Sequence, residues 1–128
     1  MMPPNAYDIV VVGSGPAGQK AAIQGAKAGK KVVLIEQEQG IGGNCVYRGT
    51  IPSKTLRETA LQFERLKRSS EVFEGRLRLD VPMSVLLHRL DEVVKAHECY
   101  MADQLTRNSV IYRHGRARFL SPHEVELE

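Results

Sequence analysis

Two short apolar runs dominate the first part of the sequence. Residues 7–12 end in four consecutive β-branched residues, and residues 31–35 form a second run of similar character. Such continuous runs are typical of parallel strands that are covered on both faces. The segment 17–28 between them is rich in alanine, lysine and glutamine, which predicts a helix that ends at Gly29. Strand, helix and strand in this order predict a βαβ unit.

The middle of the chain is polar and follows a helical pattern. Residues 44–66 predict one helix, in which Gly49 and Pro52 disturb the first turns. The charged segment 69–81 has no clear period and predicts a connection, and residues 82–108 predict a second long helix. The apolar positions of this second helix recur every three or four residues: Leu86, Leu90, Val93, Val94, Met101 and Leu105.

The end of the chain returns to the pattern of strands. Residues 110–112 predict a third short strand. Residues 116–120 and 125–127 predict an antiparallel hairpin, with residues 121–124 as its turn. Alternation of strands and helices indicates an α/β protein with a parallel sheet.

A glycine pattern of dinucleotide-binding type lies between the first predicted strand and the first predicted helix. Gly13 permits the tight turn out of the strand, and Gly15 lets a pyrophosphate approach the backbone. Gly18 lets the helix pack closely on the strand. Pro16 in the first turn costs no helical hydrogen bond, and the free N–H groups of the helix favour a phosphate. A purely structural glycine turn is the alternative.

Glu36 follows the second predicted strand directly, 18 positions after Gly18. A carboxylate at that place accepts hydrogen bonds from the hydroxyls of an adenosine ribose and repels a 2′-phosphate. The pattern therefore favours FAD or NAD over NADP at this site. It predicts a Rossmann-like FAD/NAD(P)-binding fold of three layers, with a parallel sheet flanked by helices and a small antiparallel hairpin, incomplete in these 128 residues.

Composition and charge change this picture little. The 128 residues carry a net charge of +3, which suits one globular domain. The densest basic cluster, Arg65, Lys67 and Arg68, has no aromatic platform beside it and indicates a solvated face rather than a nucleic-acid surface. The first residues lack a basic leader, and residues 9–12 are too short to span a membrane. We therefore expect a cytoplasmic protein with neither nucleic acid nor membrane as a partner.

The cysteines and histidines do not form a metal-binding pattern. Cys45 and Cys99 lie 54 positions apart, outside any zinc-ligand spacing, and a structural disulfide is not expected between them. We expect Cys99 to be an inert core or half-buried residue. The scattered histidines indicate surface or packing positions and no metal site: His88, His97, His114 and His123.

Further motifs identify a family. Gly42-Gly43-x-Cys45 and Gly49-Thr50-Ile51-Pro52-Ser53-Lys54 follow the glycine turn and Glu36. Together these segments resemble the FAD segment of the pyridine nucleotide–disulfide oxidoreductase family. That family has a second cysteine where this chain has Thr50, and a threonine cannot form a disulfide. In this the chain is similar to the family's transhydrogenase members, although Val46-Tyr47-Arg48 replaces their usual Thr-His stretch.

The resemblance implies FAD as the cofactor and a set of residues that hold it. The implied cofactor-binding residues are Gly13, Ser14, Gly15, Pro16, Ala17, Gly18, Glu36, Gln37, Gly42, Gly43, Asn44, Cys45, Thr50, Lys54, Gly115 and Ala117. Lys54 is implied to lie near the flavin N5 edge, where a cation favours negative charge on the reduced ring; a solvated helix residue is the alternative. Cys45 is implied to lie near the flavin, with simple packing as its alternative, and Thr50 to act as a spacer.

The resemblance also implies an activity. Members of this kind transfer hydride between NADPH and NAD⁺, which bind as substrates outside the present segment. We expect residues 1–128 to be the N-terminal segment of the FAD-binding domain, without the NAD(P)-binding and dimerisation domains and without activity alone. The whole protein is expected to be a homo-oligomer. The alternatives are a reductase similar to dihydrolipoamide dehydrogenase and a truncated, non-catalytic dinucleotide-binding or interaction module.

Overall fold

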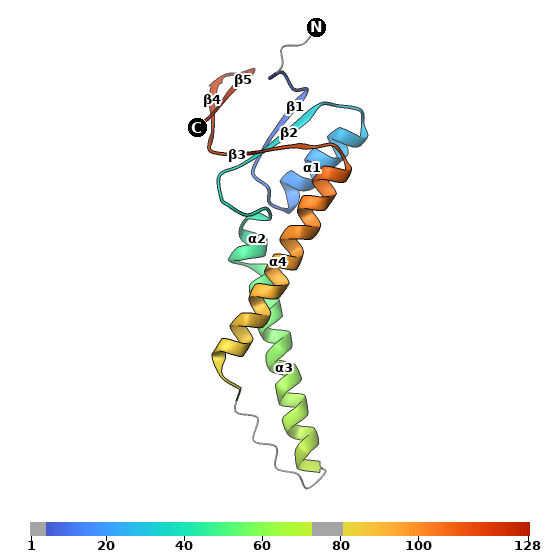
Figure 1. The fold of residues 1–128 in the computed structure, drawn as a ribbon, viewed down its shortest axis with the longest axis vertical. Coiled ribbons are helices and arrows are strands. Elements are labelled where there is room, and N and C mark those ends of the chain that lie inside the picture. The colour runs from blue at the N-terminus through green and yellow to red at the C-terminus, as the bar shows by residue number, and fades with distance from the viewer. Residues whose placement is uncertain (1–4, 73–80) are drawn as a thin grey trace.

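A three-stranded parallel sheet forms the centre of the molecule. The computed structural model describes residues 5–72 and 81–128. Its strands β1 (Ile9–Val12), β2 (Val32–Glu36) and β3 (Ile111–His114) lie in the order β1-β2-β3 (Figure 1). Because β2 lies between two parallel neighbours, all five of its residues are buried. The predicted strands are confirmed, with β1 starting two residues later than expected and β3 shifted toward the C-terminus by one to two residues.

Helix α1 (Pro16–Lys27) joins β1 to β2 and packs on one face of the sheet. Its Ala22 is fully buried against Val32 and Leu34. Gly29 ends the helix as expected, with a φ of 76° and its N–H donated to the Ala26 carbonyl oxygen. The βαβ unit predicted from the sequence is thereby confirmed.

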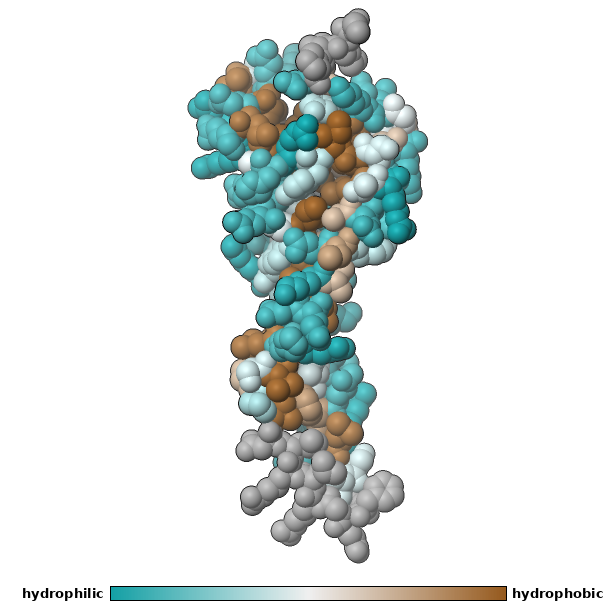
Figure 2. Space-filling view, viewed as in Figure 1, coloured by the Kyte–Doolittle hydropathy of each residue, from teal (hydrophilic) through white to brown (hydrophobic). Residues whose placement is uncertain are grey.

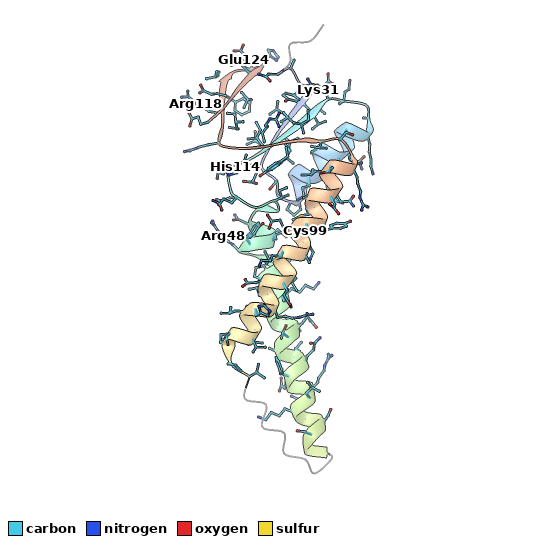
Figure 3. The ribbon with its side chains drawn as sticks, in the orientation of Figure 1. Lys31, Arg48, Cys99, His114, Arg118 and Glu124 are labelled. Carbon is cyan, nitrogen blue, oxygen red and sulfur yellow. The ribbon has the colours of Figure 1, made fainter. Side chains whose placement is uncertain are left out.

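Helix α4 (Met83–Arg107) covers the same face with its last turns. Leu105 of this helix and Val110 after it belong to the core cluster that also contains Leu34. The six apolar positions expected to face inward are all half-buried or buried. Cys99, however, is exposed (Figure 3), so its expected core or half-buried position was wrong. The apolar face of α4 turns away at that position, and a cysteine is small enough to be tolerated in solvent.

The single helix expected over residues 44–66 is instead two helices, α2 (Gly43–Tyr47) and α3 (Thr50–Val72). The chain breaks at Gly49, where a side chain would meet the Asn44 carbonyl oxygen at 3.1 Å. Pro52 is the third residue of α3, and in a first turn its missing N–H costs no helical bond. Part of the connection expected over residues 69–81 is therefore helical, and its residues 73–80 lie outside the described part of the chain.

The hairpin β4 (Ala117–Ser121) and β5 (Glu124–Leu127) lies across the other face of the sheet. A cavity of about 670 Å³ separates them, lined among others by Val33 and Ile35 of β2 and by Val125 of the hairpin. Helices, sheet and hairpin make three layers, which confirms the expected α/β class.

The first strand is less covered than its sequence indicated. Val10 and Val12 are 39% and 55% exposed, whereas Ile9 and Val11 pack against the core cluster. The prediction that this strand is buried on both faces was therefore wrong. The cause is the thin cover on this side, because the hairpin leaves a cavity where helices cover the other face.

Helices α3 and α4 run antiparallel and form an arm that extends away from the sheet (Figure 1). Its far part, α3 beyond residue 60 and the first turns of α4, is called the arm here. Apolar side chains are exposed on it (Figure 2): Leu66, Met83, Val85 and Leu87. None of the described helices is both long and apolar enough to cross a membrane.

Candidate dinucleotide site

The glycine turn after β1 has the geometry that its sequence predicts. Gly13 has a φ of 95°, a conformation that side-chain-bearing residues rarely adopt. A Cβ on Gly18 would overlap the Gly13 carbonyl oxygen, so only glycine lets α1 start this close to the strand. A Cβ on Gly15 would meet no atom within 4 Å. The space beside Gly15 is therefore open to a ligand.

The N-terminus of α1 opens directly beside this turn. Gly15 is the N-cap residue, and no side chain caps the helix. The first helical residue is Pro16, and the first N–H with a backbone partner is that of Gln19, which donates to the Gly15 carbonyl oxygen at 3.0 Å. The N–H groups of Ala17 and Gly18 and the helix dipole favour an anion at this place. The arrangement suits a pyrophosphate.

Ser14 and Glu36 join the glycine turn to the end of β2. The Ser14 N–H and hydroxyl both donate to Glu36 Oε2, at 2.8 and 2.7 Å. The Ser14 hydroxyl in turn accepts the Gly42 N–H at 3.0 Å. Ser14 is fully buried, so its side chain holds three segments together and turns away from the open space beside Gly15.

The Glu36 carboxylate is buried, with 5% exposure, and accepts a third hydrogen bond, from the Glu38 N–H to Oε1 at 2.9 Å. Burial would raise the pKa of Glu36, but the hydrogen bonds from Glu38 and Ser14 outweigh burial and hold the pKa below its ordinary value. A carboxylate offers about four acceptor positions. Since three are filled from within the chain, the structure leaves room for one ribose hydroxyl rather than two.

A hollow of about 200 Å³ lies where β2 and β3 end. Four of the expected site residues line it together: Gly13, Glu36, Gln37, Gly115 and Ala117 include these and the turn glycine. Gly115 has a φ of 147°, and its N–H donates to the Glu36 carbonyl oxygen at 2.8 Å. We call this hollow the adenosine pocket, after the ligand part that its shape and position suit.

The loop after β2 returns to the glycine turn. A Cβ on Gly43 would lie 3.1 Å from Gly15 Cα, so the two backbones touch. Gly43 and Asn44 line a second hollow of about 220 Å³ together with Tyr47. The Tyr47 ring fills the space beside Gly40, where a Cβ would overlap its hydroxyl. Burial, with the nearby Glu98 carboxylate, raises the pKa of Tyr47 to about 12.

The residues expected next to the flavin lie apart from the adenosine pocket. Cys45 is half-buried on α2, and Thr50 is exposed at the first position of α3. Lys54 is exposed and lines a groove of about 420 Å³ between α3 and α4, with His97 on the facing helix. The structure therefore brings the nucleotide-binding residues together and leaves Lys54 on a separate surface. Both cysteines are free thiols.

Two residues near the site were not expected from the sequence. Gln19 is buried on α1, and its side-chain amide donates to the Ser14 carbonyl oxygen at 2.9 Å and lies 2.8 Å from Met101 Sδ. Arg116 lines the adenosine pocket. The signal for Arg116 was its place between Gly115 and Ala117, but nothing in the sequence shows the burial of a helical glutamine.

Comparison with known proteins agrees with this geometry. The family model described as pyridine nucleotide-disulphide oxidoreductase matches residues 7–126. The chain belongs to this family. The resemblance seen in the sequence is thereby confirmed, and the family supports a flavin oxidoreductase.

Relatives within the family are longer proteins. The soluble pyridine nucleotide transhydrogenase of Mycobacterium bovis (strain BCG / Pasteur 1173P2) is 43% identical over 124 residues, which are 95% of this chain and 26% of that protein. The enzyme of the same name from Hahella chejuensis (strain KCTC 2396) is 36% identical over 124 residues, 94% of this chain and 26% of that protein. The chain thus spans about a quarter of the length of these relatives.

A solved structure of the family has the same fold. It is the Cu(II) complex of the HOCl-induced flavoprotein disulfide reductase RclA from Escherichia coli. The TM-score is 0.78 with 29% identity, over 97% of this chain and 25% of that chain. Among residues 5–72 and 81–128, no group of three or more His, Cys, Asp or Glu side chains is placed to hold a metal ion.

Proposed function

We propose that this chain binds the ADP half of FAD as part of a flavin-dependent oxidoreductase. The observation that carries the proposal is the open approach at Gly15, set between the free N-terminus of α1 and the buried Glu36 carboxylate. The residues fit the cofactor: backbone N–H groups face an anion, and a carboxylate with one remaining acceptor position faces a ribose.

FAD supplies the hydride-accepting and hydride-donating chemistry when bound. The chain's own contribution is binding and orientation. The first turn of α1 would hold the pyrophosphate, Glu36 would fix the ribose, and Gly115 and Ala117 would flank the adenine. Lys54 carries a positive charge near the start of α3, and we propose that this charge favours the reduced flavin in the whole protein.

The activity we propose for the whole protein is hydride transfer between NADPH and NAD⁺. Two observations support this choice over disulfide reduction. Thr50 replaces the second cysteine of the family's redox pair, and the relatives named above are soluble pyridine nucleotide transhydrogenases. Further domains to bind NAD(P), and assembly into a homo-oligomer, belong to the same proposal.

Cofactor binding is tested by titrating FAD with the 128-residue chain and following flavin fluorescence. We expect saturable binding that ADP competes for and FMN does not, because FMN lacks the ADP half. The matched variant is Gly15→Ala, whose Cβ would occupy the open approach without touching the protein. Its binding should fall while its thermal unfolding stays close to that of the wild type. Absence of saturable FAD binding would contradict the proposal.

Activity is tested by adding NADPH and an NAD⁺ analogue to the chain with FAD. We expect no turnover by the isolated chain, because the nicotinamide-binding domains are not in these residues. The full-length protein should turn over without reducing a dithiol substrate such as lipoamide. Turnover by the isolated chain near that of a full-length relative would contradict our account, and lipoamide-coupled activity of the full-length protein would favour the reductase alternative.

The exposed first strand favours one other function, a non-catalytic interaction module. Val10 and Val12 are exposed apolar side chains on an edge strand of the sheet. Such edges pair with other chains. Size-exclusion chromatography with light scattering distinguishes the two, since a monomer that binds FAD is not such a module.

A further inference from the structure

We propose that Arg116 covers the adenine ring of the bound cofactor and thereby sets the affinity of the adenosine pocket. This inference rests on the proposed FAD binding. Arg116 lines the pocket of about 200 Å³ at the ends of β2 and β3. No role has been given to it above, because the glycine motif points only to its neighbours Gly115 and Ala117.

The Arg116 side chain is available for a ligand. Within residues 5–72 and 81–128, its guanidinium has neither a hydrogen bond nor an ion pair. Arg118, two residues further along, is different: its guanidinium bonds to Glu126 Oε2 at 2.6 Å and lies 3.6 Å from Glu128 Oε1. The same hairpin therefore carries one arginine engaged in structure and one without a partner at the mouth of the pocket.

The backbone of Arg116 is held in place. Its N–H donates to the Glu128 carbonyl oxygen, and its carbonyl oxygen accepts the Glu128 N–H, both at 2.9 Å. The preceding Gly115 packs so closely that a Cβ would lie 2.5 Å from the same Glu128 oxygen. Because the backbone is fixed on both sides, the side chain projects from a defined point at the rim of the pocket.

The surroundings favour a neutral ring over a phosphate. Val12 and Ile35 give the pocket apolar walls. The Glu36 carboxylate lines the same pocket, and its lowered pKa keeps it charged at neutral pH. A phosphate here would meet that negative charge, whereas a purine would find apolar contact and the planar face of a guanidinium. Arginine stacks on aromatic rings in this way and lysine does not.

The test compares Arg116→Ala with the control Arg118→Ala, using adenosine, ADP and FAD as probes of the 128-residue chain. We expect Arg116→Ala to weaken all three by about three- to tenfold, the range of a cation–π contact at a partly exposed site. Arg118→Ala should bind all three as the wild type does. Arg116→Lys should also bind more weakly, because it keeps the charge but loses the planar face.

Several results would overturn the inference. Equal affinities in Arg116→Ala and Arg118→Ala would show that Arg116 contributes nothing, while FAD binding by the wild type would still stand. Loss of ADP binding with adenosine unchanged would place the guanidinium on the phosphates. Wild-type affinity in Arg116→Lys would exclude stacking. A wild-type chain that binds none of the probes would overturn both this inference and the proposed function.

Discussion

The sheet region and the arm use the same helix α4 in different ways. At its C-terminal end α4 is packed into the core, where Leu105 is 2% exposed beside the fully buried Leu34. At its N-terminal end, in the arm, Leu87 is 48% exposed. The dinucleotide site lies in the sheet region, where burial and hydrogen bonds are complete within the chain. The stability of the site should therefore depend on the sheet region and little on the arm.

The sharpest test of this difference replaces one leucine in each region. Leu105→Ala should lower the free energy of unfolding by about 2–5 kcal/mol, because it leaves a cavity in the core. Leu87→Ala should change it by no more than about 0.5 kcal/mol, as exposed positions do. Urea unfolding followed by circular dichroism measures both. Equal losses would mean that the arm is as tightly packed as the sheet region.

A second comparison lies within the glycine turn. Gly18→Ala should destabilise the chain by about 3 kcal/mol, because its Cβ would overlap the Gly13 carbonyl oxygen and α1 would have to move. Gly15→Ala has open space and should leave stability nearly unchanged. Thermal unfolding of the two variants checks this. A Gly18→Ala chain as stable as the wild type would show that the turn tolerates movement.

The smallest effect concerns Glu36. Its pKa in the folded chain lies below the ordinary value of 4.5, so the charged form stabilises the fold above about pH 4.5 and that contribution is lost as the pH falls through the folded-state pKa. Glu36→Gln should cost about 1–2 kcal/mol at pH 7. It should also flatten the fall in stability between pH 5 and pH 3.

The arm again provides the control for this pH dependence. Glu64 pairs with Arg68 at 2.9 Å on the exposed surface of α3. Glu64→Gln should leave the pH profile close to that of the wild type, because exposed pairs contribute little. Unfolding midpoints measured at several pH values would contradict the account if Glu36→Gln and Glu64→Gln gave the same profile.

Much of the sheet region could be predicted from the sequence, because strand and helix periods there agree with the glycine and acidic positions. The break at Gly49 could not, since it depends on a close approach to the Asn44 carbonyl oxygen that forms only in the folded chain. The inward turn of the Ser14 hydroxyl escaped prediction for the same reason, because its partners lie 22 and 28 positions away. The exposure of Val12 depends on the cover above the strand, which no local pattern reports.

The hydrogen bonds on Ser14 and Glu36 have a consequence for how such a chain can change over time. All four of them join groups at or before residue 42: the Ser14 N–H and hydroxyl, the Glu38 N–H and the Gly42 N–H are the donors. Position 50 contributes to none. A lineage could therefore exchange cysteine for threonine there while its nucleotide-binding frame stayed intact. The frame and the reactive segment are separable modules, so new chemistry could evolve beside the flavin without rebuilding the site that holds it.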